Sequence, residues 1–493
     1  MDQPRKINLA WLLIFFFLLQ LGLGFLVIDG ATLSFDESIW HYIGRNWLRY
    51  GLIPYTGGVD NKCPFMFAIY GFSDLLFGLN YWFPRILGAL AQTIGIFFLF
   101  KLVEKIVGYK AAIVAISIYG LSLAWKSTGG KYIAYTESYE ISLILTAFYF
   151  FFRNDRKNSF FISGCLAGLS IFFRLTGIFG AIALLFESIK KGRTSWLFFL
   201  AGLASSSIFS LAIMAIAGIP LQEIFIYGFT DNFGKGSISG NSLVWKVEHL
   251  VDGFFLSDLA LFIPGLVGYM LIKKRVDVFV LWFLLTFIGI NLIGLYARQH
   301  FRDLLPCMSV MTAVAISFLM DRYQINWKAV LIITWISFFP KQIEPLLELK
   351  NLLRPGKVQP RLFCDDTDLK VYDEDKRALG EWVQNNSSIN ERVYIAGMSA
   401  VVQVYANRLS PTIYFNNTET KRARKRLLED LASHKPDFIL IPTSSDYLRV
   451  DLSVRKFIDS LLAKEYRYET CQYNYAVFRN QPVAPTGHGS SVD

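Results

Sequence analysis

The sequence has few charged residues and few of the residues that bind metal ions. Of its 493 residues only 18% are Asp, Glu, Lys or Arg, and it contains five cysteines, five histidines and neither a CxxC nor an HExxH pattern. A dedicated zinc site is therefore not expected. Residues 341–480 also lack a glycine-rich phosphate-binding loop, so no cofactor is assigned to them.

Hydrophobic residues make up 53% of the chain and aromatic residues 16%, and the mean hydropathy is +0.38. A soluble protein of this composition would expose too much apolar surface, so a polytopic membrane protein is predicted. The net charge of +10 does not indicate nucleic-acid binding, because Lys and Arg fall in short clusters between hydrophobic runs. No nucleic-acid partner is expected.

Before about residue 340, apolar segments alternate with short polar loops, and about eleven of these segments are predicted to span the membrane. Several are shorter than the roughly 20 residues that a straight spanning helix needs. No small-residue cleavage site follows the first segment, so it is predicted to be retained. The segments are 7–28, 84–103, 110–126, 137–152, 159–173, 175–189, 194–218, 256–272, 277–296, 303–320 and 328–340.

Basic clusters occupy alternate loops, and the positive-inside rule places them all in the cytoplasm. The clusters are Arg5/Lys6, Lys101/Lys105/Lys110, Arg153/Arg156/Lys157, Lys190/Lys191/Arg193, Lys273/Lys274/Arg275 and Arg322/Lys328. The other loops then face outward: the loop around Asp36, the stretch 132–139, the loop 219–255, the stretch 298–302 and the C-terminal region. The polar residues that are unusual in a membrane protein therefore all lie on the outward side of the membrane.

The composition changes after residue 340, where predicted helices and strands alternate in polar sequence. We predict a transmembrane domain over 1–340 with a first outer loop at 29–83, and an extracytoplasmic small α/β domain with a mainly parallel sheet over 341–480. Residues 481–493 are predicted to form a disordered tail. Cys364 and Cys471 both lie in the outer domain, where a disulfide is permitted, but spacing alone leaves their pairing open.

The stretch "SFDESIWHYIGRNWLRYGLIPYTGGVDNKCP", residues 34–64, follows the first predicted span. Ser34 and Glu37 fit a capping box, and acidic residues in a first turn complement the helix dipole. Helix capping therefore explains the presence of Glu37 better than it explains the presence of Asp36. The helix that follows carries Trp40 and Tyr42, so we expect it to lie flat on the outer face of the bilayer.

Further ionisable residues are predicted on the outer side, where charges at the membrane are candidates for function. Glu137 begins a span, Lys62 lies in a turn flanked by glycine and proline, and Arg174 lies between two adjacent spans. The stretch "YARQHFRDLLP" adds Arg298, His300 and Arg302. The alternative to a functional role, for any one of these residues, is that its side chain reaches out to the membrane surface (snorkelling) or contacts an anionic lipid.

The first outer loop resembles that of the GT-C glycosyltransferases, in particular the branch of protein O-mannosyltransferases and lipid A aminoarabinose transferases. The resemblance rests on Asp36-Glu37, on the G-x-x-P-Y motif from Gly51 to Tyr55, and on the D-x-K-x-P motif from Asp60 to Pro64. The resemblance covers essentially the whole chain, including the body of many spans and the C-terminal extracytoplasmic domain. Cys63 stands where the family usually has proline, and Glu137 where relatives often carry aspartate.

The resemblance implies transfer of a sugar from a polyprenyl-phosphate carrier to a lipid, glycan or protein acceptor outside the cytoplasm, and it favours the inner membrane of a bacterium. The attacking hydroxyl needs a base, for which Asp36 is predicted, with Glu137 as a second acidic group. Fixed cations would stabilise the departing phosphate. Direct displacement would invert the anomeric carbon, and no cofactor is required, while the use of a divalent metal is left open.

The site residues assigned in this way form three sets. Asp36 and Glu137 are predicted to be catalytic, and Glu37, Tyr55, Asp60 and Tyr135 to support the acceptor side. The residues predicted to bind the phosphate of the donor are Lys62, Arg302, Arg298, His300 and Arg174.

Two other classes of protein share the many spans. A secondary transporter usually shows paired repeats and charges near the bilayer midplane, whereas no clear internal repeat is found here and the charges lie at the outer edge. A non-catalytic protein that binds polyprenyl lipids in an assembly would tolerate substitution of Asp36.

Overall fold

The structure is a computed structural model that describes residues 7–26, 32–130, 132–230, 243–255, 257–272, 277–294, 296–339, 373–397, 400–415, 420–443 and 447–481. The chain divides into two compact units. The first, here called the helical unit, comprises Met1–Ala31, Asn61–Ser73 and Asn80–Pro355. The second, here called the mixed unit, comprises Thr32–Asp60, Asp74–Leu79 and Gly356–Asp493. The predicted boundaries near 340 and 480 fall at the edges of undescribed segments, and the predicted tail lies outside the described residues.

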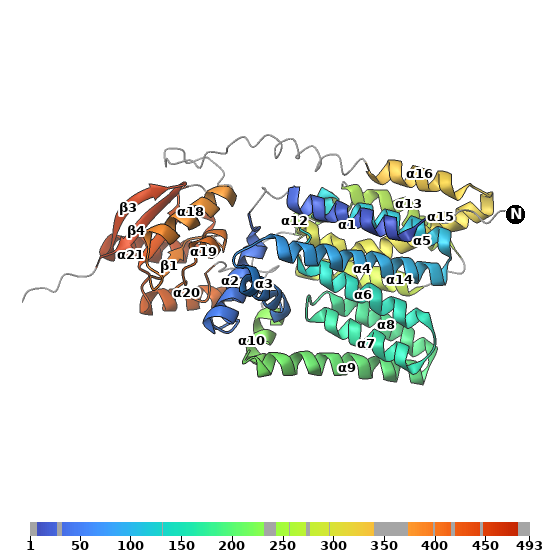
Figure 1. The fold of residues 1–493 in the computed structure, drawn as a ribbon, viewed down its shortest axis with the longest axis horizontal. Coiled ribbons are helices and arrows are strands. Elements are labelled where there is room, and N and C mark those ends of the chain that lie inside the picture. Colours follow the sequence, from blue (N-terminus) through green and yellow to red (C-terminus); the bar gives the residue numbers. More distant parts are fainter. Residues whose placement is uncertain are drawn as a thin grey trace, which may run out of the picture. The chain divides into compact units, whose positions relative to one another are not determined.

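The helical unit is built from long apolar helices that run alongside one another (Figure 1). Helix α6 packs against α4 and α7, and α7 also packs against α8 and α9. The elements of the described part are α1 (Leu9–Leu26), α3 (Pro64–Phe77), α4 (Trp82–Ile106), α5 (Tyr109–Ser122), η1 (Lys126–Thr128), α6 (Thr136–Arg153), α7 (Lys157–Ile171), α8 (Gly177–Lys191), α9 (Arg193–Ile216), α10 (Leu221–Phe225), η2 (Ile226–Thr230), α12 (Leu243–Leu250), η3 (Val251–Phe255), η4 (Asp258–Phe262), α13 (Ile263–Met270), α14 (Asp277–Ile293), η5 (Arg298–Leu304), α15 (Leu305–Tyr323) and α16 (Trp327–Phe338).

By length and composition, three helical segments of the described chain could each cross a membrane: Trp82–Ile106, Arg193–Ile216 and Arg298–Tyr323. The bent pair Leu243–Phe255 and Asp258–Met270 would add a fourth. Shorter apolar helices occur at Leu9–Gly24, Pro64–Phe77, Tyr109–Ser122, Asp277–Leu292 and Trp327–Phe338. The polytopic helical architecture is confirmed, while the count of about eleven spans stays a prediction.

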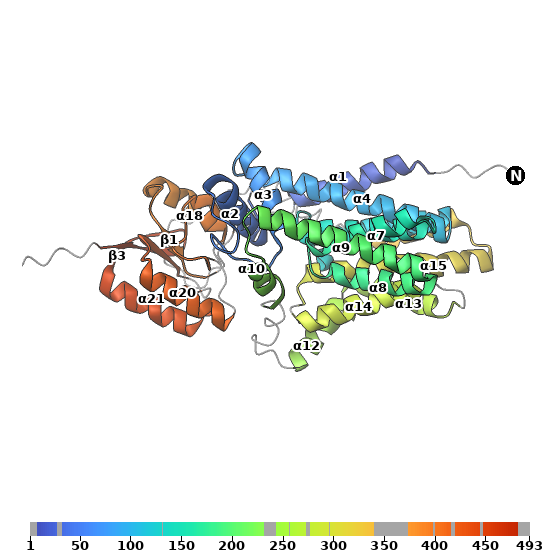
Figure 2. The ribbon, with the colours of Figure 1, turned by 90° about the horizontal axis from the view of Figure 1, so that it is seen from below.

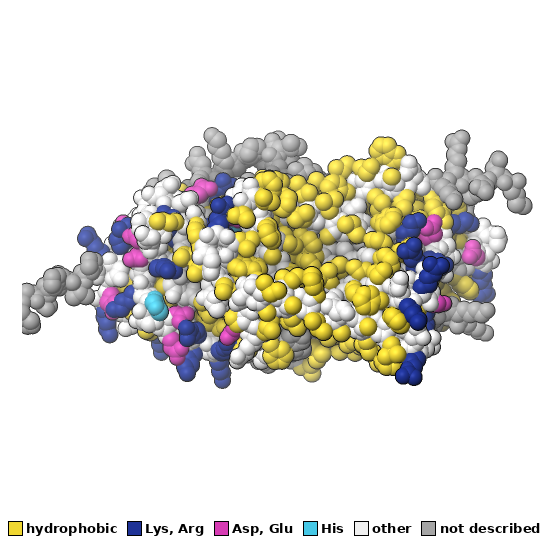
Figure 3. All heavy atoms as spheres, turned by 60° about the horizontal axis from the view of Figure 1, so that its bottom comes forward, with side chains coloured by type: hydrophobic (Ala, Val, Ile, Leu, Met, Phe, Trp, Pro, Cys, Tyr) yellow, Lys and Arg dark blue, Asp and Glu magenta, His cyan; other side chains and the backbone are white. Residues whose placement is uncertain are grey.

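The outer surface of the helical unit is apolar. Ile208, Phe209 and Ile216 of α9 are exposed, Ile216 to 87%. Hydrophobic side chains cover much of the right-hand part of the view in Figure 3 and give way to Lys and Arg at its end. Such a continuous apolar surface is typical of contact with lipid.

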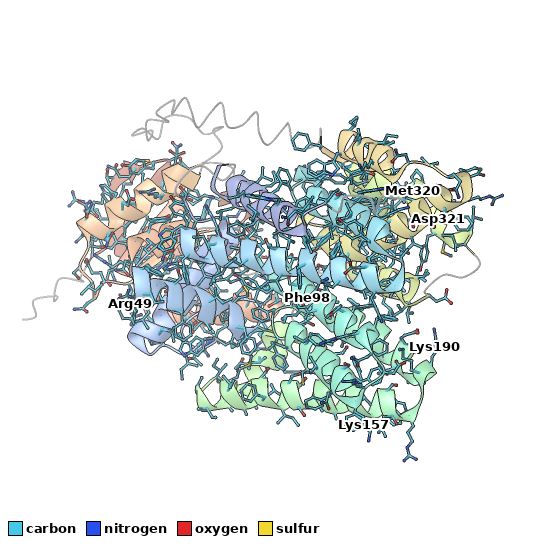
Figure 4. All side chains as sticks on the ribbon, turned by 45° about the vertical axis from the view of Figure 1, so that its right-hand side comes forward. Arg49, Phe98, Lys157, Lys190, Met320 and Asp321 are labelled. Atoms are coloured by element: carbon cyan, nitrogen blue, oxygen red, sulfur yellow. The ribbon has the colours of Figure 1, made fainter. Side chains whose placement is uncertain are left out.

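Two of the basic loops that were predicted to share one side of the membrane lie at the same end of the helical unit. In Figure 4, Lys157 and Lys190 lie at the same end of the helical unit as Asp321, whereas Phe98 lies about midway along α4. Helix α6 runs from Thr136 to Arg153 and is separated by three residues from Lys157, where α7 begins, so Glu137 lies at the opposite end. Which end faces the cytoplasm stays a prediction.

Helices α7 and α9 approach each other through glycines. A Cβ atom built on Gly164 would lie 2.0 Å from the carbonyl oxygen of Phe199, and one built on Gly202 would lie 2.0 Å from that of Phe161. Both obstacles are backbone atoms, which cannot turn aside. Small residues at membrane helix interfaces allow this close backbone approach.

The mixed unit contains a four-stranded sheet in the order β1-β2-β4-β3, made of β1 (Val393–Ile395), β2 (Phe438–Pro442), β3 (Tyr466–Gln472) and β4 (Tyr475–Asn480). Its helices are α2 (Phe35–Tyr50), α18 (Asp373–Asn386), α19 (Ala400–Ala406), η7 (Tyr447–Arg449), α20 (Lys421–Ser433) and α21 (Leu452–Glu465). Figure 2 shows α20 and α21 side by side, and they are in contact.

The prediction of a mainly parallel sheet is wrong, although the predicted strands and helices are present. Only β1 and β2 pair in parallel; β2 with β4 and β3 with β4 are antiparallel. The reason is the tight turn at Tyr473 and Asn474, both with positive φ, which folds β3 back onto β4 as a hairpin. Cys471 on β3 takes part in a disulfide, and because Cys364 lies outside the described residues the pairing of these two cysteines stays a prediction.

Helix α2 folds with the mixed unit, where it packs against α19. The Tyr42 hydroxyl accepts a hydrogen bond from the Ser410 amide at 2.9 Å, and the Tyr42 ring lies 4.3 Å from that of Phe415. Trp40 is fully buried. These two aromatic residues therefore pack against protein, which corrects the expectation that they lie at the lipid interface.

Replacing Gly202 with valine is predicted to destabilise the protein by about 1–3 kcal/mol, because the new side chain meets the backbone of α7. Thermal unfolding of the purified protein in detergent measures the effect. The control is Ala201→Val, which gives the same residue at an exposed neighbouring position of α9. Equal unfolding temperatures for the two variants would contradict the close packing of α7 and α9.

Candidate functional site

A buried arginine holds two carboxylates at the end of the helical unit opposite Lys157. Arg174 Nη1 lies 2.7 Å from Asp303 Oδ1 and 2.9 Å from Asp303 Oδ2, and 3.1 Å from Glu137 Oε1. Glu137 and Asp303 are 3% and 4% exposed. In a site so poorly hydrated these charge-assisted contacts are strong, and each partner depends on the others to stay charged.

Three separate segments bring these side chains together. Glu137 lies in the first turn of α6, where a carboxylate also complements the helix dipole, and its Oε2 accepts from the Thr136 hydroxyl at 3.0 Å. Arg174 lies in the short turn between α7 and α8, as the sequence predicted, and its amide donates to the Ser170 carbonyl. Asp303 lies in η5, just before α15.

Arg302 lies beside this cluster and is fully buried. Its Nη1 donates to the Tyr132 carbonyl at 2.9 Å and its Nη2 to the Leu123 carbonyl at 3.4 Å. Its Nε has no hydrogen-bond partner among the described residues. The hydrogen bonds of this guanidinium thus go to neutral carbonyls, while the nearby carboxylates of Glu137 and Asp303 act on it through their charge.

Glu140 adds a third buried carboxyl one turn further along α6. It interacts electrostatically with Asp303, Arg174 and Glu137, and its Oε2 has no hydrogen-bond partner in the described chain. The cluster thus contains three carboxyls, Glu137, Glu140 and Asp303, and two guanidiniums, Arg174 and Arg302. These five buried ionisable side chains therefore form one group in a protein whose interior is otherwise mostly apolar.

The other predicted residues of the helical unit take varied positions. Lys62 is half-buried, with Nζ 3.0 Å from Asn61 Oδ1. His300 is half-buried and acts electrostatically on Glu137. Arg298 is exposed. Tyr135 is buried and stacks on Tyr132 with ring centroids 4.6 Å apart, which places an aromatic pair next to the carbonyl that Arg302 binds.

The predicted acidic residues of the first outer loop belong to the mixed unit. Glu37 is buried, and its Oε2 accepts from the Ser34 amide at 2.8 Å, which confirms the predicted capping box. Asp60 Oδ2 accepts from the Trp40 indole at 2.9 Å. Asp36 is half-buried in the first turn of α2. Glu37 and Asp60 therefore each make a structural contact within the mixed unit.

Tyr55 of the G-x-x-P-Y motif is buried and adopts a φ of 70°. A left-handed conformation is unfavourable for a bulky side chain and persists only where its surroundings fix it. Its amide donates to the Gly58 carbonyl at 2.8 Å, which closes the turn.

A second polar cluster lies on α2, within the mixed unit. Arg49 binds both the carboxylate and the carbonyl of Asp74, and His41 Nε2 lies 3.7 Å from Asp74 Oδ1. Burial, aided by the charge of Arg45, lowers the pKa of His41 to about 3. His41 is therefore neutral at pH 7, and its contact with Asp74 is not an ion pair.

Asp303 and Glu140 were missed from the sequence. Asp303 follows Arg302 directly, where it was not distinguished from the first residue of a span. Glu140 follows Glu137 by three residues, which places both on one face of a helix, and this spacing was the signal available. Among the described residues, no three His, Cys, Asp or Glu side chains form a group that could hold a metal ion.

Residues 61–220 match a family model described as dolichyl-phosphate-mannose-protein mannosyltransferase. The matched segment contains Lys62, Glu137 and Arg174 but neither Asp36 nor Arg302. No curated protein matches the sequence of the chain.

Several solved structures are similar to the whole chain. ArnT from Cupriavidus metallidurans bound to undecaprenyl phosphate is 12% identical, with a TM-score of 0.63 over 97% of this chain and 99% of that one. Its apo state gives a TM-score of 0.65 at 12% identity, over 96% and 98%. The Archaeoglobus fulgidus oligosaccharyltransferase in complex with Zn and sulfate is 11% identical, with a TM-score of 0.55 over 87% and 67%.

The chain has the GT-C glycosyltransferase fold. The resemblance predicted from the first outer loop is thus confirmed, and the GT-C fold together with the apolar helices identifies an integral membrane protein. The individual roles of the predicted site residues stay predictions.

Replacing Arg174 with glutamine is predicted to cost about 3–5 kcal/mol, because Glu137 and Asp303 would be left buried without their cation. Unfolding of the purified variant in detergent measures the loss. Arg298→Gln is the control, because the exposed Arg298 should change stability by no more than about 0.5 kcal/mol. A stable Arg174→Gln protein would mean that the two carboxylates do not depend on this arginine.

The free energy of unfolding is predicted to rise as the pH increases from about 3 to 6.5. In this range His41 binds a proton in the unfolded chain but not in the folded protein. The contribution falls as pH drops below 6.5 and is constant above it, with a slope of at most about 1.4 kcal/mol per pH unit. Unfolding of wild type, His41→Gln and the exposed control His434→Gln at several pH values measures it. Only His41→Gln should flatten the profile; parallel profiles for all three would refute the assignment.

Proposed function

We propose that the chain transfers a sugar from a polyprenyl-phosphate-linked donor to an acceptor hydroxyl on the extracytoplasmic face of the membrane. The observation that carries the proposal is the similarity to ArnT bound to undecaprenyl phosphate over nearly the whole length of both chains. The match of residues 61–220 to a mannosyltransferase family model supports the same donor chemistry.

In the proposed reaction the acceptor hydroxyl attacks the anomeric carbon and the bond to the lipid phosphate breaks. The phosphate leaves with the bonding electrons and gains negative charge in the transition state. A cation that is already fixed stabilises this charge without reorganising. Arg302 suits this role, because its guanidinium is held by two carbonyls and keeps Nε unbonded to the described residues.

Lys62, Arg298 and His300 are the further proposed donor ligands. Arg174 is a weaker candidate than the sequence suggested, because Glu137 and Asp303 already engage its Nη1. We assign Arg174 instead the task of holding Glu137 ionised and in place, since a neighbouring guanidinium favours the charged carboxylate. Glu137 would then present a fixed negative charge to the acceptor side, with Tyr135 beside it.

Asp36 is the proposed general base, which takes the proton of the acceptor hydroxyl. Of the two adjacent carboxylates of the motif, Glu37 is buried in the helix cap and Asp36 is the more exposed. Attack by the acceptor with direct loss of the lipid phosphate would invert the anomeric carbon. The bacterial inner membrane, with the reaction on its periplasmic side, is the proposed location.

Asp36→Asn is predicted to lower turnover about 10²–10⁴-fold while donor binding is kept, because it removes the base but not the cations. Release of free polyprenyl phosphate from a panel of polyprenyl-phosphate sugars measures turnover by the purified protein in lipid, with crude membrane lipids and glycans as acceptors. The anomeric configuration of the product, determined by NMR, tests inversion.

The matched control is Asp155→Asn, which neutralises an exposed carboxylate near Lys191 at the other end of the helical unit. It should leave turnover unchanged. Full turnover by Asp36→Asn would move the base elsewhere, with Glu137 the next residue to substitute. Absence of turnover with every donor, in a protein that still binds polyprenyl phosphate, would favour a binding protein over an enzyme.

A further inference from the structure

Helix α20 carries its charges in the order that the helix dipole disfavours. Five of its first six residues are basic, namely Lys421, Arg422, Arg424, Lys425 and Arg426, and its acids Glu429 and Asp430 come later. Cations near a helix N-terminus face the partial positive charge of that end. The stability of α20 therefore does not account for this run of basic residues.

Much of this positive charge is accessible to solvent. The side chains of Lys425 and Arg426 are 80% and 60% exposed, and their partners Glu429 and Asp430 lie 3.9 Å and 2.9 Å away on the same helix. Exposed pairs of this kind contribute little. Lys421 and Arg422 are also exposed, whereas Ala423, Leu427 and Leu431 face the interior.

Two exposed leucines lie close in the sequence to the ion-pair partner of Arg424. Arg424 Nη1 is 3.2 Å from Asp451 Oδ2, and Asp451 caps the start of α21. Leu452, the first residue of α21, is 56% exposed, and Leu448 in η7 is 67% exposed. Between residues 373 and 481, the only other large hydrophobic side chains of comparable exposure in the described ranges are Ile389 and Tyr468.

We propose that this surface, here called the basic corner and defined by Lys421, Arg422, Arg424, Lys425, Leu448 and Leu452, binds the anionic phospholipid surface of the bilayer. Cations around exposed aliphatic side chains are the arrangement that binds anionic membranes, since the cations meet headgroup phosphates and the aliphatic groups enter the interface. An acidic polysaccharide would be attracted by the cations but would leave the leucines in water.

The connectivity of the chain favours a bilayer as the partner. The mixed unit begins at Thr32, after the segment 27–31 that follows α1, and returns to the helical unit at Asn61. Five residues reach at most about 18 Å. The mixed unit is therefore tethered to membrane helices, so weak contacts suffice for binding because the effective concentration of lipid is high. This inference does not depend on the proposed transferase activity.

The test uses the full-length protein in nanodiscs of phosphatidylcholine alone or mixed with phosphatidylglycerol. An environment-sensitive fluorophore is attached at Leu448→Cys, with labelled wild type as the blank, because Cys63 and Cys307 are buried and Cys165 is half-buried. Hydrogen exchange of residues 421–433 and 447–456 in the unaltered protein gives a readout without any substitution.

We expect blue-shifted emission and slower exchange in the anionic nanodiscs, both reversed by about 1 M salt, which shortens the screening length to about 3 Å. Each cation near such a surface contributes about 1 kcal/mol, or about fivefold in the equilibrium constant, so Lys421→Glu with Lys425→Glu should lower the equilibrium constant for membrane contact by at least about 25-fold. The control Lys464→Glu, at the far end of α21, should keep the response.

Equal emission and exchange in both kinds of nanodisc would overturn the proposal. A response to an added acidic polysaccharide without any response to phosphatidylglycerol would also overturn it, and would assign the basic corner to a glycan instead.

Discussion

The contact of Arg174 with Glu137 and Asp303 holds the candidate site of the helical unit together. One guanidinium nitrogen joins the start of α6, the turn between α7 and α8, and η5, which are far apart in the sequence. None of these charges could remain buried alone, because desolvation of a single ion costs several kcal/mol. The fold at this end of the bundle and the ionisation of its carboxylates therefore depend on each other.

The scarcity of charge elsewhere makes this cluster more informative. Most helix contacts of the unit use apolar side chains or closely approaching glycines, as between α7 and α9. Such packing needs no ionisable groups, so three carboxyls and two guanidiniums at one end of a membrane bundle are not explained by assembly alone. Arg302 differs from Arg174 within this cluster, because neutral carbonyls and not carboxylates accept its hydrogen bonds.

The sequence predicted the class of fold and most elements because hydrophobic runs, basic clusters and capping residues are local signals. Ser34 and Glu37 gave the start of α2 correctly, and Arg174 was correctly placed between two helices. Asp303 and the antiparallel pairing of β2 with β4 were not obtained, because each depends on contacts between distant segments. Trp40 and Tyr42 show the same limit: aromatic residues next to a membrane span suit both lipid and protein, and only the tertiary structure reveals that they pack within the mixed unit.

That packing has a consequence for Asp36. Helix α2 is fixed at its start by the capping box, in its middle by the bond of Tyr42 to the Ser410 amide, and by Arg45, whose Nη1 donates to the Val404 carbonyl at 2.9 Å. The backbone of α2, which carries Asp36, is therefore held by contacts with α19 and the segment after it. A general base works only when it is held within reach of the proton it removes. In the proposed reaction the contacts of α2 within the mixed unit therefore support the base.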